Sequence, residues 1–471
     1  MSFTHDTWVG PFSWRYGSPQ MRQLWSETHK RRLWRRIWVA LAEAQMRAGL
    51  VQEAQVDDLR ARADDVNIDR SHELEAILHH DLMAELRCFA EQCPVGGGIL
   101  HLGATSMDIE DNADALRLRA SLTLLGEGLR DLLLILARKT EEEADHVCIG
   151  WTHLQPAEPT TVGYRLAGYA QDLLVDYEAL LDLQRSLRGK GFKGAVGTAA
   201  SWHQLLEGRT LTAEALEADI MDNLGLAAFP VATQTCSRRQ DWQYVTLLAG
   251  IGMTLYRLAF DLRLLQSPPV GEWAEPFAEQ QVGSSAMPFK RNPVNAENID
   301  SLGRYLATLP RVAWDNGAHN LLERTLDDSA NRRIVLPQAS LCCDELLRRT
   351  RRMLEGLRLD DGAIRHNLER YGTFAASERV LMAACLAGGD RQHLHEVIRG
   401  HSMNAWQALS SGEPNPLTDL LCGEEELLRL LSGARIRELM RAQDYVGDAP
   451  GRARAMAGRV LAACTRRKDL P

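Results

Sequence analysis

Several long stretches of this chain place apolar residues at alternating spacings of three and four. This period is that of a helix packed along most of its length. One stretch carries a single leucine seam, at Leu118, Leu122, Leu125, Leu129, Leu132 and Leu136. Similar seams run through Val245, Leu248, Gly252, Leu255, Ala259 and Leu262, through Leu166, Leu173 and Leu180, and through Ile299, Leu302, Leu306 and Leu309. Gly250 and Gly252 would allow close helix approach. The seams therefore predict long packed helices.

The segments between the seams divide the chain into parts. A helix over residues 241–266 would span roughly 39 Å at 1.5 Å per residue, more than a small compact domain needs. Loops rich in Gly, Pro or polar residues separate the long segments, at 150–161, 267–293 and 324–333. No alternating apolar and polar run is long enough for a substantial sheet. We therefore predict an all-α fold with an N-terminal helical domain over 1–105, a central long-helix bundle over 106–358, and a C-terminal helical domain over 359–471.

Seams of this length commonly bury their apolar faces against other chains as well as their own. A homo-oligomer is therefore the prediction, and a monomeric bundle is the alternative.

The balance of charged residues indicates which kinds of partner the chain can bind. The 471 residues include 54 Lys or Arg and 63 Asp or Glu, a formal net charge of -9, without a block of basic residues. Nucleic acid is excluded as a partner on this argument, because phosphate neutralisation needs a concentrated basic surface. An anionic small molecule must instead be held by a few local cations, and most of these are arginines.

Membrane insertion and export are not indicated. The N-terminus lacks a basic region followed by an apolar stretch, and the longest apolar stretch, 242–265, is interrupted by Arg257, Asp261 and Arg263. The nine cysteines form no CxxC pair, and we read them as reduced, mostly buried thiols. These observations predict a cytoplasmic protein.

The segment from Gly283 to Pro293 combines several features of an anion site. It begins with a glycine and two serines, which suit a mobile loop, and it ends with Asn292 as a plausible N-cap before Pro293. Lys290 and the amides of the following helix would both stabilise negative charge. The alternative is an ordinary helix cap without a ligand.

The segment from Arg324 to Arg333 places three arginines and a serine hydroxyl within ten residues. Arginine suits bidentate capture of a carboxylate or a phosphate. The alternative is a solvated charged turn, in which the arginines pair with Asp327 and Asp328.

Two histidines are candidates for proton transfer, since imidazole titrates close to neutrality. His153 lies in a loop before a helix that Thr160 or Thr161 would cap, and His80 precedes Asp81, whose carboxylate could fix its tautomer. A structural role is the alternative for each. The remaining histidines lack the spacing of a zinc helix, so no metal site is predicted.

Taken together, these segments resemble the fumarase/aspartase superfamily. Gly283–Pro293 is similar to its signature loop. Thr152–Gly163 is similar to its second conserved region, and His101–Asn112 is similar to its first. Three further segments resemble the branch that splits adenylosuccinate, namely Arg324–Arg333, His80–Asp81 and Arg15–Pro19. The matches run in order from about residue 15 to residue 400.

The resemblance implies a three-domain chain that forms a homotetramer with a shared helical core, and active sites built from three chains. It implies anti β-elimination of fumarate from adenylosuccinate, which leaves AMP, and from the succinylated carboxamide ribotide of purine synthesis. It implies no cofactor, no metal and no nucleic-acid or membrane partner.

The resemblance also implies the roles of single residues. Ser284 is the general base, His153 is the general acid with His80 in support, and Lys290 and Asn292 hold the aci-carboxylate that forms. The nucleotide and its phosphate are assigned to Arg15, Tyr16, Arg324, Ser329 and Arg333. The succinyl group is assigned to Thr105, Ser106, Thr152 and Gln234.

Two positions depart from the pattern of the superfamily. Asn298 stands where some members carry arginine, and Trp151 replaces a smaller or basic residue just before His153. A sister lyase that acts on another N-substituted or nitro-substituted succinate is therefore the alternative function. A catalytically silent structural protein is a third reading, which the presence of Ser284, Lys290 and His153 disfavours.

Overall fold

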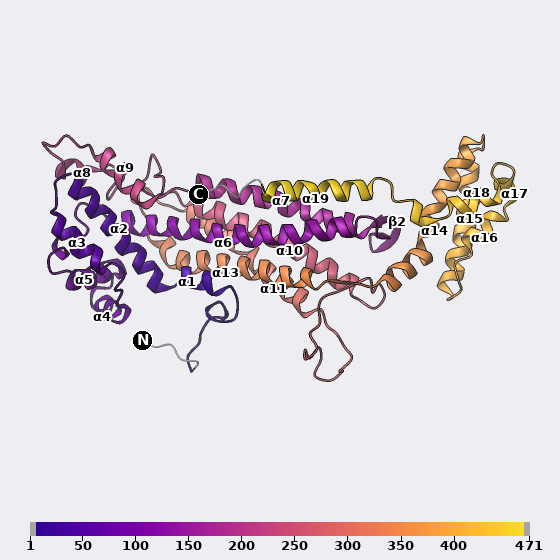
Figure 1. The fold of residues 1–471 in the computed structure, drawn as a ribbon, viewed down its shortest axis with the longest axis horizontal. Helices are drawn as coiled ribbons and strands as arrows, with labels where there is room; N and C mark the ends of the chain where they lie inside the picture. Colours follow the sequence, from indigo (N-terminus) through magenta and orange to yellow (C-terminus); the bar gives the residue numbers. More distant parts are fainter. Residues whose placement is uncertain (1–5, 466–471) are drawn as a thin grey trace. The chain divides into compact units, whose positions relative to one another are not determined.

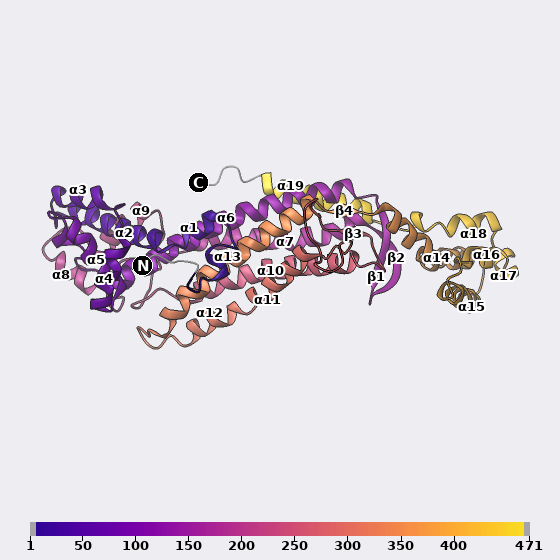
Figure 2. The same ribbon diagram turned by 90° about the horizontal axis from the view of Figure 1, so that it is seen from below.

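The computed structural model describes residues 6–465, and nearly all of its regular structure is helical. The chain forms two compact units, and Figures 1 and 2 show the helices and strands of both. The first unit consists of Met1–Leu129, Asp176–Met253 and Ser301–Arg348, and the second consists of Arg130–Val175, Thr254–Asp300 and Arg349–Pro471. The all-α prediction is confirmed.

Five long helices contain the points where the chain passes from one unit to the other. These are α6 (Ser106–Glu142), α7 (Val162–Ser186), α10 (Arg239–Leu265), α11 (Val294–Leu306) and α13 (Asp327–Glu355). The leucine seam of α6 is buried throughout, and so is the seam of α10. A Cβ at Gly252 of α10 would lie 3.0 Å from Leu306 Cδ2, so the glycine permits the close approach of α10 and α11. The helices predicted from the seams are confirmed, except that the fourth seam is interrupted after Leu306, since Leu309 begins α12 (Leu309–Ala318).

The first unit also contains shorter helices (Figure 1). They are η1 (Pro11–Ser13), α1 (Pro19–Leu24), α2 (Glu27–Arg47), α3 (Glu53–Arg62), α4 (Ile68–Leu78), α5 (Asp81–Gln92), η2 (Gly97–Ile99), α8 (Ala200–Leu205), α9 (Ala213–Leu224) and α12 (Leu309–Ala318). Ser26 caps α2 by accepting the N–H of His29 at 3.2 Å. The fully buried carboxylate of Glu85 ties α5 to α2, because Arg35 Nε donates to it at 2.6 Å.

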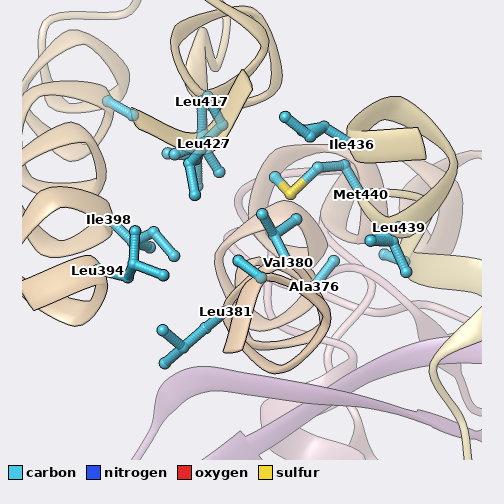
Figure 3. Close-up of a cluster of buried hydrophobic side chains, with 14 of the residues drawn as sticks. Ala376, Val380, Leu381, Leu394, Ile398, Leu417, Leu427, Ile436, Leu439 and Met440 are labelled. Atoms are coloured by element: carbon cyan, nitrogen blue, oxygen red, sulfur yellow. The ribbon is translucent and has the colours of Figure 1, made fainter. Parts of the chain in front are cut away.

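The second unit contains the remaining helices and four short strands. They are β1 (Val147–Thr152), β2 (Gln155–Thr161), β3 (Trp273–Ala274), β4 (Arg358–Leu359), α14 (Asp361–Leu386), α15 (Arg391–Ser410), α16 (Leu417–Cys422), α17 (Glu425–Leu428), α18 (Gly433–Leu439), η3 (Ala442–Asp444) and α19 (Ala449–Thr465). Figure 3 shows the apolar core of α14 to α18, with Val380 and Leu381 of α14 facing Leu394 and Ile398 of α15. Asp360 caps α14 by accepting the N–H of Ala363 at 2.9 Å. The predicted domain limits at 105 and 358 stay predictions.

The loop predicted over 150–161 is wrong, because this segment belongs to an antiparallel hairpin of β1 and β2. Its β-branched residues favour strands, and its two prolines occupy positions in a two-stranded sheet where a missing N–H is tolerated. Thr161 caps α7 as predicted, since its Oγ1 accepts the N–H of Tyr164 at 3.1 Å.

Among the described helices, α10 is the one long and apolar enough to cross a membrane, and half of that stretch is buried inside the fold. Its interrupting charges have partners on neighbouring helices: Arg257 pairs with Asp172 at 2.9 Å, and Arg263 pairs with Asp300 at 2.7 Å. These are the contacts of a helix packed within a bundle.

Candidate active site

The loop that bears Ser284 joins β3 to α11, and contacts between its two ends close its base. Asn292 Nδ2 donates to the carbonyl of Gly283 at 2.9 Å, and a Cβ at Gly283 would lie 2.1 Å from the carbonyl of Lys290. Only glycine therefore fits at this crossing. The body of the loop is exposed, including the side chain of Lys290.

Within the loop, the Ser284 hydroxyl already has two donors. Its Oγ accepts the N–H of Ala286 at 3.3 Å and the N–H of Met287 at 3.1 Å. Two backbone donors on one oxygen favour its anionic form over its neutral form. This arrangement supplies local stabilisation for a serine alkoxide.

The predicted N-cap role of Asn292 is wrong, because α11 begins at Val294 and Asn292 bonds back to the base of the loop. The helix amides that were expected to hold an anion already have a carboxylate. Glu275 accepts the N–H of Asn295 at 3.1 Å and the N–H of Ala296 at 3.0 Å. Burial raises the pKa of Glu275, and these hydrogen bonds oppose the rise. The carboxylate of Glu275 therefore already occupies the amides at the N-terminus of α11.

His153 lies at the turn of the β1–β2 hairpin, with Thr152 just before it at the end of β1. Both side chains are exposed. His153 and Leu154 both have positive φ angles, 53° and 59°, which is unusual for residues other than glycine. Ser284 and His153 are both in the second unit, and no hydrogen bond joins them among the described residues.

In the first unit, the structure brings together predicted residues that are far apart in sequence. Arg333 NH2 pairs with Asp81 Oδ2 at 2.9 Å. Asp81, Ser329 and Arg333 line one small cavity of about 70 Å³, together with Glu110 of α6. Burial raises the pKa of Glu110 to about 8, and the carboxylates of Asp81, Asp114 and Asp111 add to the rise.

Asp81 does not fix His80 as predicted. His80 is the N-cap of α5, and its Nδ1 is a weak acceptor for the N–H of Met83 at 3.5 Å. Its Nδ1 lies 3.8 Å from Asp81 Oδ1, beyond hydrogen-bond distance, because that carboxylate is held by Arg333 and by the N–H of Leu82.

The arginines of segment 324–333 pair with carboxylates, as in the alternative of a charged turn. Some of these pairs are buried rather than solvated. Arg324 NH1 donates to Asp328 Oδ1 at 3.1 Å. Asp328 is buried, and its other oxygen accepts Arg238 Nε at 2.7 Å. Arg332 is buried against Asp241 at 2.7 Å. A buried charge network therefore holds the start of α13.

The loop of Gln234 is anchored to the same network. Asp111 of α6 accepts the N–H of Cys236 at 2.7 Å and Arg238 NH1 at 2.8 Å. The N–H of Gln234 donates to the carbonyl of Glu323 at 3.1 Å. This places Gln234 beside the segment that leads to Arg324.

Thr105 and Ser106 lie where α6 begins. Asp108 Oδ2 accepts the N–H of Thr105 at 2.9 Å, and its other oxygen binds the buried ammonium of Lys190 and the N–H of Lys193 at 3.2 Å. Asp108, Arg238 and Glu110 were not predicted from the sequence. The acids at 108, 110, 111 and 114, clustered near the start of α6, were the available signal.

Arg15 and Tyr16 precede α1 and lie along the middle of α13. The N–H of Gly17 donates to Glu345 Oε2 at 3.0 Å, and the N–H of Ser18 donates to Asp344. Asp344 follows Arg333 by 11 residues on the same helix. At 1.5 Å per residue, the α13 residue that anchors Ser18 lies about 17 Å along the helix from Arg333.

Two further features concern the side chains that could bind a metal ion or form disulfides. No three His, Cys, Asp or Glu side chains within residues 6–465 lie close enough to hold a metal ion together. All nine cysteines are free, and seven of them are buried.

Comparisons with known proteins agree over nearly the whole chain. A family described as "Lyase" matches residues 14–305, and one described as "Adenylosuccinate lyase C-terminus" matches residues 373–456. The chain is 37% identical to an adenylosuccinate lyase of Schistosoma mansoni over 89% of this chain and 88% of that one. It is 34% identical to an adenylosuccinate lyase of Saccharomyces cerevisiae over 95% and 93% of the two chains.

Solved structures give the same fold. A fumarate lyase of Mesorhizobium sp. BNC1 matches with a TM-score of 0.82 and 25% identity, over 95% of this chain and 98% of that one. A 3-carboxy-cis,cis-muconate lactonizing enzyme of Pseudomonas putida matches with a TM-score of 0.84 and 24% identity, over 97% and 99% of the two chains. The second likeness bears on the fold alone.

Proposed function

The chain belongs to the adenylosuccinate lyase family of carbon–nitrogen lyases, and from this premise we propose how it releases fumarate from adenylosuccinate. A base removes a proton from the succinyl carbon next to a carboxylate, the C–N bond breaks, and the departing nitrogen gains a proton. The products are fumarate and AMP. The succinylated carboxamide ribotide of purine synthesis reacts in the same way.

Ser284 is the base in this proposal, and the observation that carries it is the hydrogen bonding of its hydroxyl. The two N–H groups on Ser284 Oγ lower the cost of forming the alkoxide that a serine base requires. Lys290 and Asn292 then stabilise the negative charge that develops on the substrate carboxylate. The exposed body of the loop leaves it free to cover a bound substrate.

His153 protonates the departing nitrogen, with His80 in a supporting role. The exposed hairpin turn suits a residue that must reach a ligand held by other segments. Thr105, Ser106, Thr152 and Gln234 hold the succinyl group by hydrogen bonds from hydroxyl and amide groups.

Arg324, Ser329 and Arg333 bind the nucleotide phosphate. In the structure these arginines pair with Asp328 and Asp81, so a phosphate must compete with or share these carboxylates. Arginine can do this because its planar group offers five donors.

Arg15 and Tyr16 belong to the same phosphate site, and in this proposal a second chain contributes to it. About 17 Å of α13 separates their anchor from Arg333 within one chain, at 1.5 Å per residue. A second copy could supply the missing residues. We therefore propose a homotetramer with active sites shared between subunits.

The sister-lyase alternative is less well supported, because the curated relatives named above are adenylosuccinate lyases. Cytoplasmic localisation is also a proposal, supported by the free, mostly buried cysteines.

A substrate assay tests the function. The purified protein is incubated with adenylosuccinate while fumarate and AMP are followed, and turnover on the order of 1 to 10³ per second is expected. Release of fumarate from another substituted succinate, with none from adenylosuccinate, would favour the sister lyase. Release from neither would favour a silent protein.

A further inference from the structure

The hairpin turn that carries His153 has a backbone conformation that its own sequence does not favour. A two-residue turn with positive φ at both positions is normally built from Asn-Gly or similar pairs. Here it is built from His153 and Leu154, with φ angles of 53° and 59°. Non-glycine residues in this region carry strain, which persists only where the surroundings impose it. Contacts outside the turn must therefore hold His153 in place.

Strand β1 supplies these contacts through alternating side chains. Ile149 is fully buried in the core formed by α14 to α18. The pairing register shifts between Ile149 and Trp151, which oppose Pro159 and Pro156, so the extra residue lies on β2; a Cβ at Gly150 would lie 2.7 Å from the carbonyl of Glu158. Trp151 follows Ile149 by two residues, and its ring meets that of Tyr371 of α14 edge to face with centroids 5.8 Å apart.

Two more rings extend this contact away from the strand. Tyr371 lies 6.3 Å from Trp406 of α15, and Trp406 lies 5.4 Å from Phe374 of α14. We call Trp151, Tyr371, Trp406 and Phe374 the four-ring cluster. Trp151 is the member on the strand, and it stands two residues before His153.

We propose that Trp151 and Tyr371 are positioning residues that dock the hairpin on α14 and so fix His153 for proton transfer to the departing nitrogen. This inference rests on the proposed role of His153 as the acid. Aromatic pairs contribute beyond their buried area, and their preferred edge-to-face geometry gives the contact a direction. A flexible aliphatic side chain would bury area without that direction.

The indole N–H of Trp151 provides a conservative control. It is buried and has no hydrogen-bond partner among the described residues. Trp151→Phe should therefore keep the ring contact and most of the activity, whereas Trp151→Leu and Tyr371→Leu remove the contact. A misplacement of about 1 Å can cost about 100-fold in rate, so we expect kcat to fall about 10- to 100-fold in the leucine variants, with KM changed by less than about threefold.

Trp406→Leu is the matched control for loss of aromatic packing within the four-ring cluster. Trp406 belongs to the same cluster, but it contacts Tyr371 and Phe374 and makes no ring contact with Trp151. It should lower the thermal midpoint about as much as Tyr371→Leu while kcat stays within about threefold of the parent. Equal losses of kcat in both variants would overturn the positioning role.

A double-mutant cycle separates positioning from a general structural effect. If Trp151 acts through His153, then Trp151→Leu should not lower further the residual rate of His153→Ala. If Trp151→Leu lowered the rate of His153→Ala by as much as it lowers the rate of the parent, the proposal would be overturned. It would also be overturned if both leucine variants folded and kept the parent's kcat while His153→Ala was inactive. Near-full activity of His153→Ala itself would instead remove the acid role, and the positioning role with it.

Discussion

At the scale of single residues, the chemistry of Ser284 depends on its immediate hydrogen bonds. A serine in a flexible loop is a poor base, and the sequence showed no feature that would activate it. The structure gives its oxygen two backbone donors from Ala286 and Met287. Such contacts depend on how the chain turns after Ser284, which side-chain identity alone does not reveal. The residue type could be predicted, but its environment could not.

Ser284→Ala and His153→Ala should each lower kcat by about 10²- to 10⁴-fold, because each removes a proton-transfer group. Steady-state fumarate release measures the loss. Native mass and thermal midpoint should stay close to those of the parent, since both side chains are at least partly exposed. A folded variant with near-full activity would show that its residue has another role.

Glu110 makes stability depend on pH in a defined direction. Burial raises its pKa to about 8 in the fold, from an ordinary value of 4.5. Between these values the folded state binds a proton that the unfolded state has lost, so the stability of the parent falls as pH rises. Glu110→Gln lacks this titration. Its thermal midpoint relative to the parent should therefore rise from pH 5 to pH 8 and then level off.

Matched thermal unfolding of the two proteins across this range measures the effect. A difference that stays constant with pH, or falls as pH rises, would contradict a neutral Glu110 in the folded protein.

At the scale of elements, periodicity predicted the long helices because their apolar seams are long enough to be unambiguous. The seam of α6 extends from Leu118 to Leu136 and is buried throughout. The β1–β2 hairpin is too short to give such a signal, and Gly150 with its neighbouring prolines resembled a loop. The contact of Asp81 with Arg333 joins segments about 250 residues apart in sequence. No local pattern predicts which distant segments meet.

The N-terminus of α11 follows the general preference of helix N-termini for an anion, but the sequence did not predict which anion it binds. Its amides do hold an anion, but the anion is Glu275 of the same chain. Glu275→Ala should destabilise the fold by about 1–2 kcal/mol, as loss of a helix cap does. Thermal or urea unfolding measures the loss. Asp390→Ala, which removes an exposed cap of α15, is a matched control for capping alone.

If the Glu275 variant unfolded at the parent's midpoint, the carboxylate would not be what stabilises this helix end. If it lost fumarate release as well, the loop of Ser284 would depend on the same anchor.

At the scale of the whole molecule, the proposed homotetramer requires apolar surface that other copies can cover. Apolar side chains remain exposed on long helices, including Val175, Met253 at 71% and Phe260 at 54%. Large exposed apolar side chains on such helices suit burial against other copies. Native mass spectrometry should give about four times the 52.6 kDa of one chain. A stable monomer at working concentration would exclude shared sites.

The proposal that active sites are shared between subunits predicts that one site takes Ser284 and His153 from different chains. The most direct measurement mixes Ser284→Ala chains with His153→Ala chains, lets the subunits exchange, verifies mixed oligomers by native mass, and measures fumarate release from adenylosuccinate. With equal amounts and random assembly, about a quarter of the sites would receive both intact residues, so about a quarter of the parent rate should return. No recovery in verified mixed oligomers would contradict the claim.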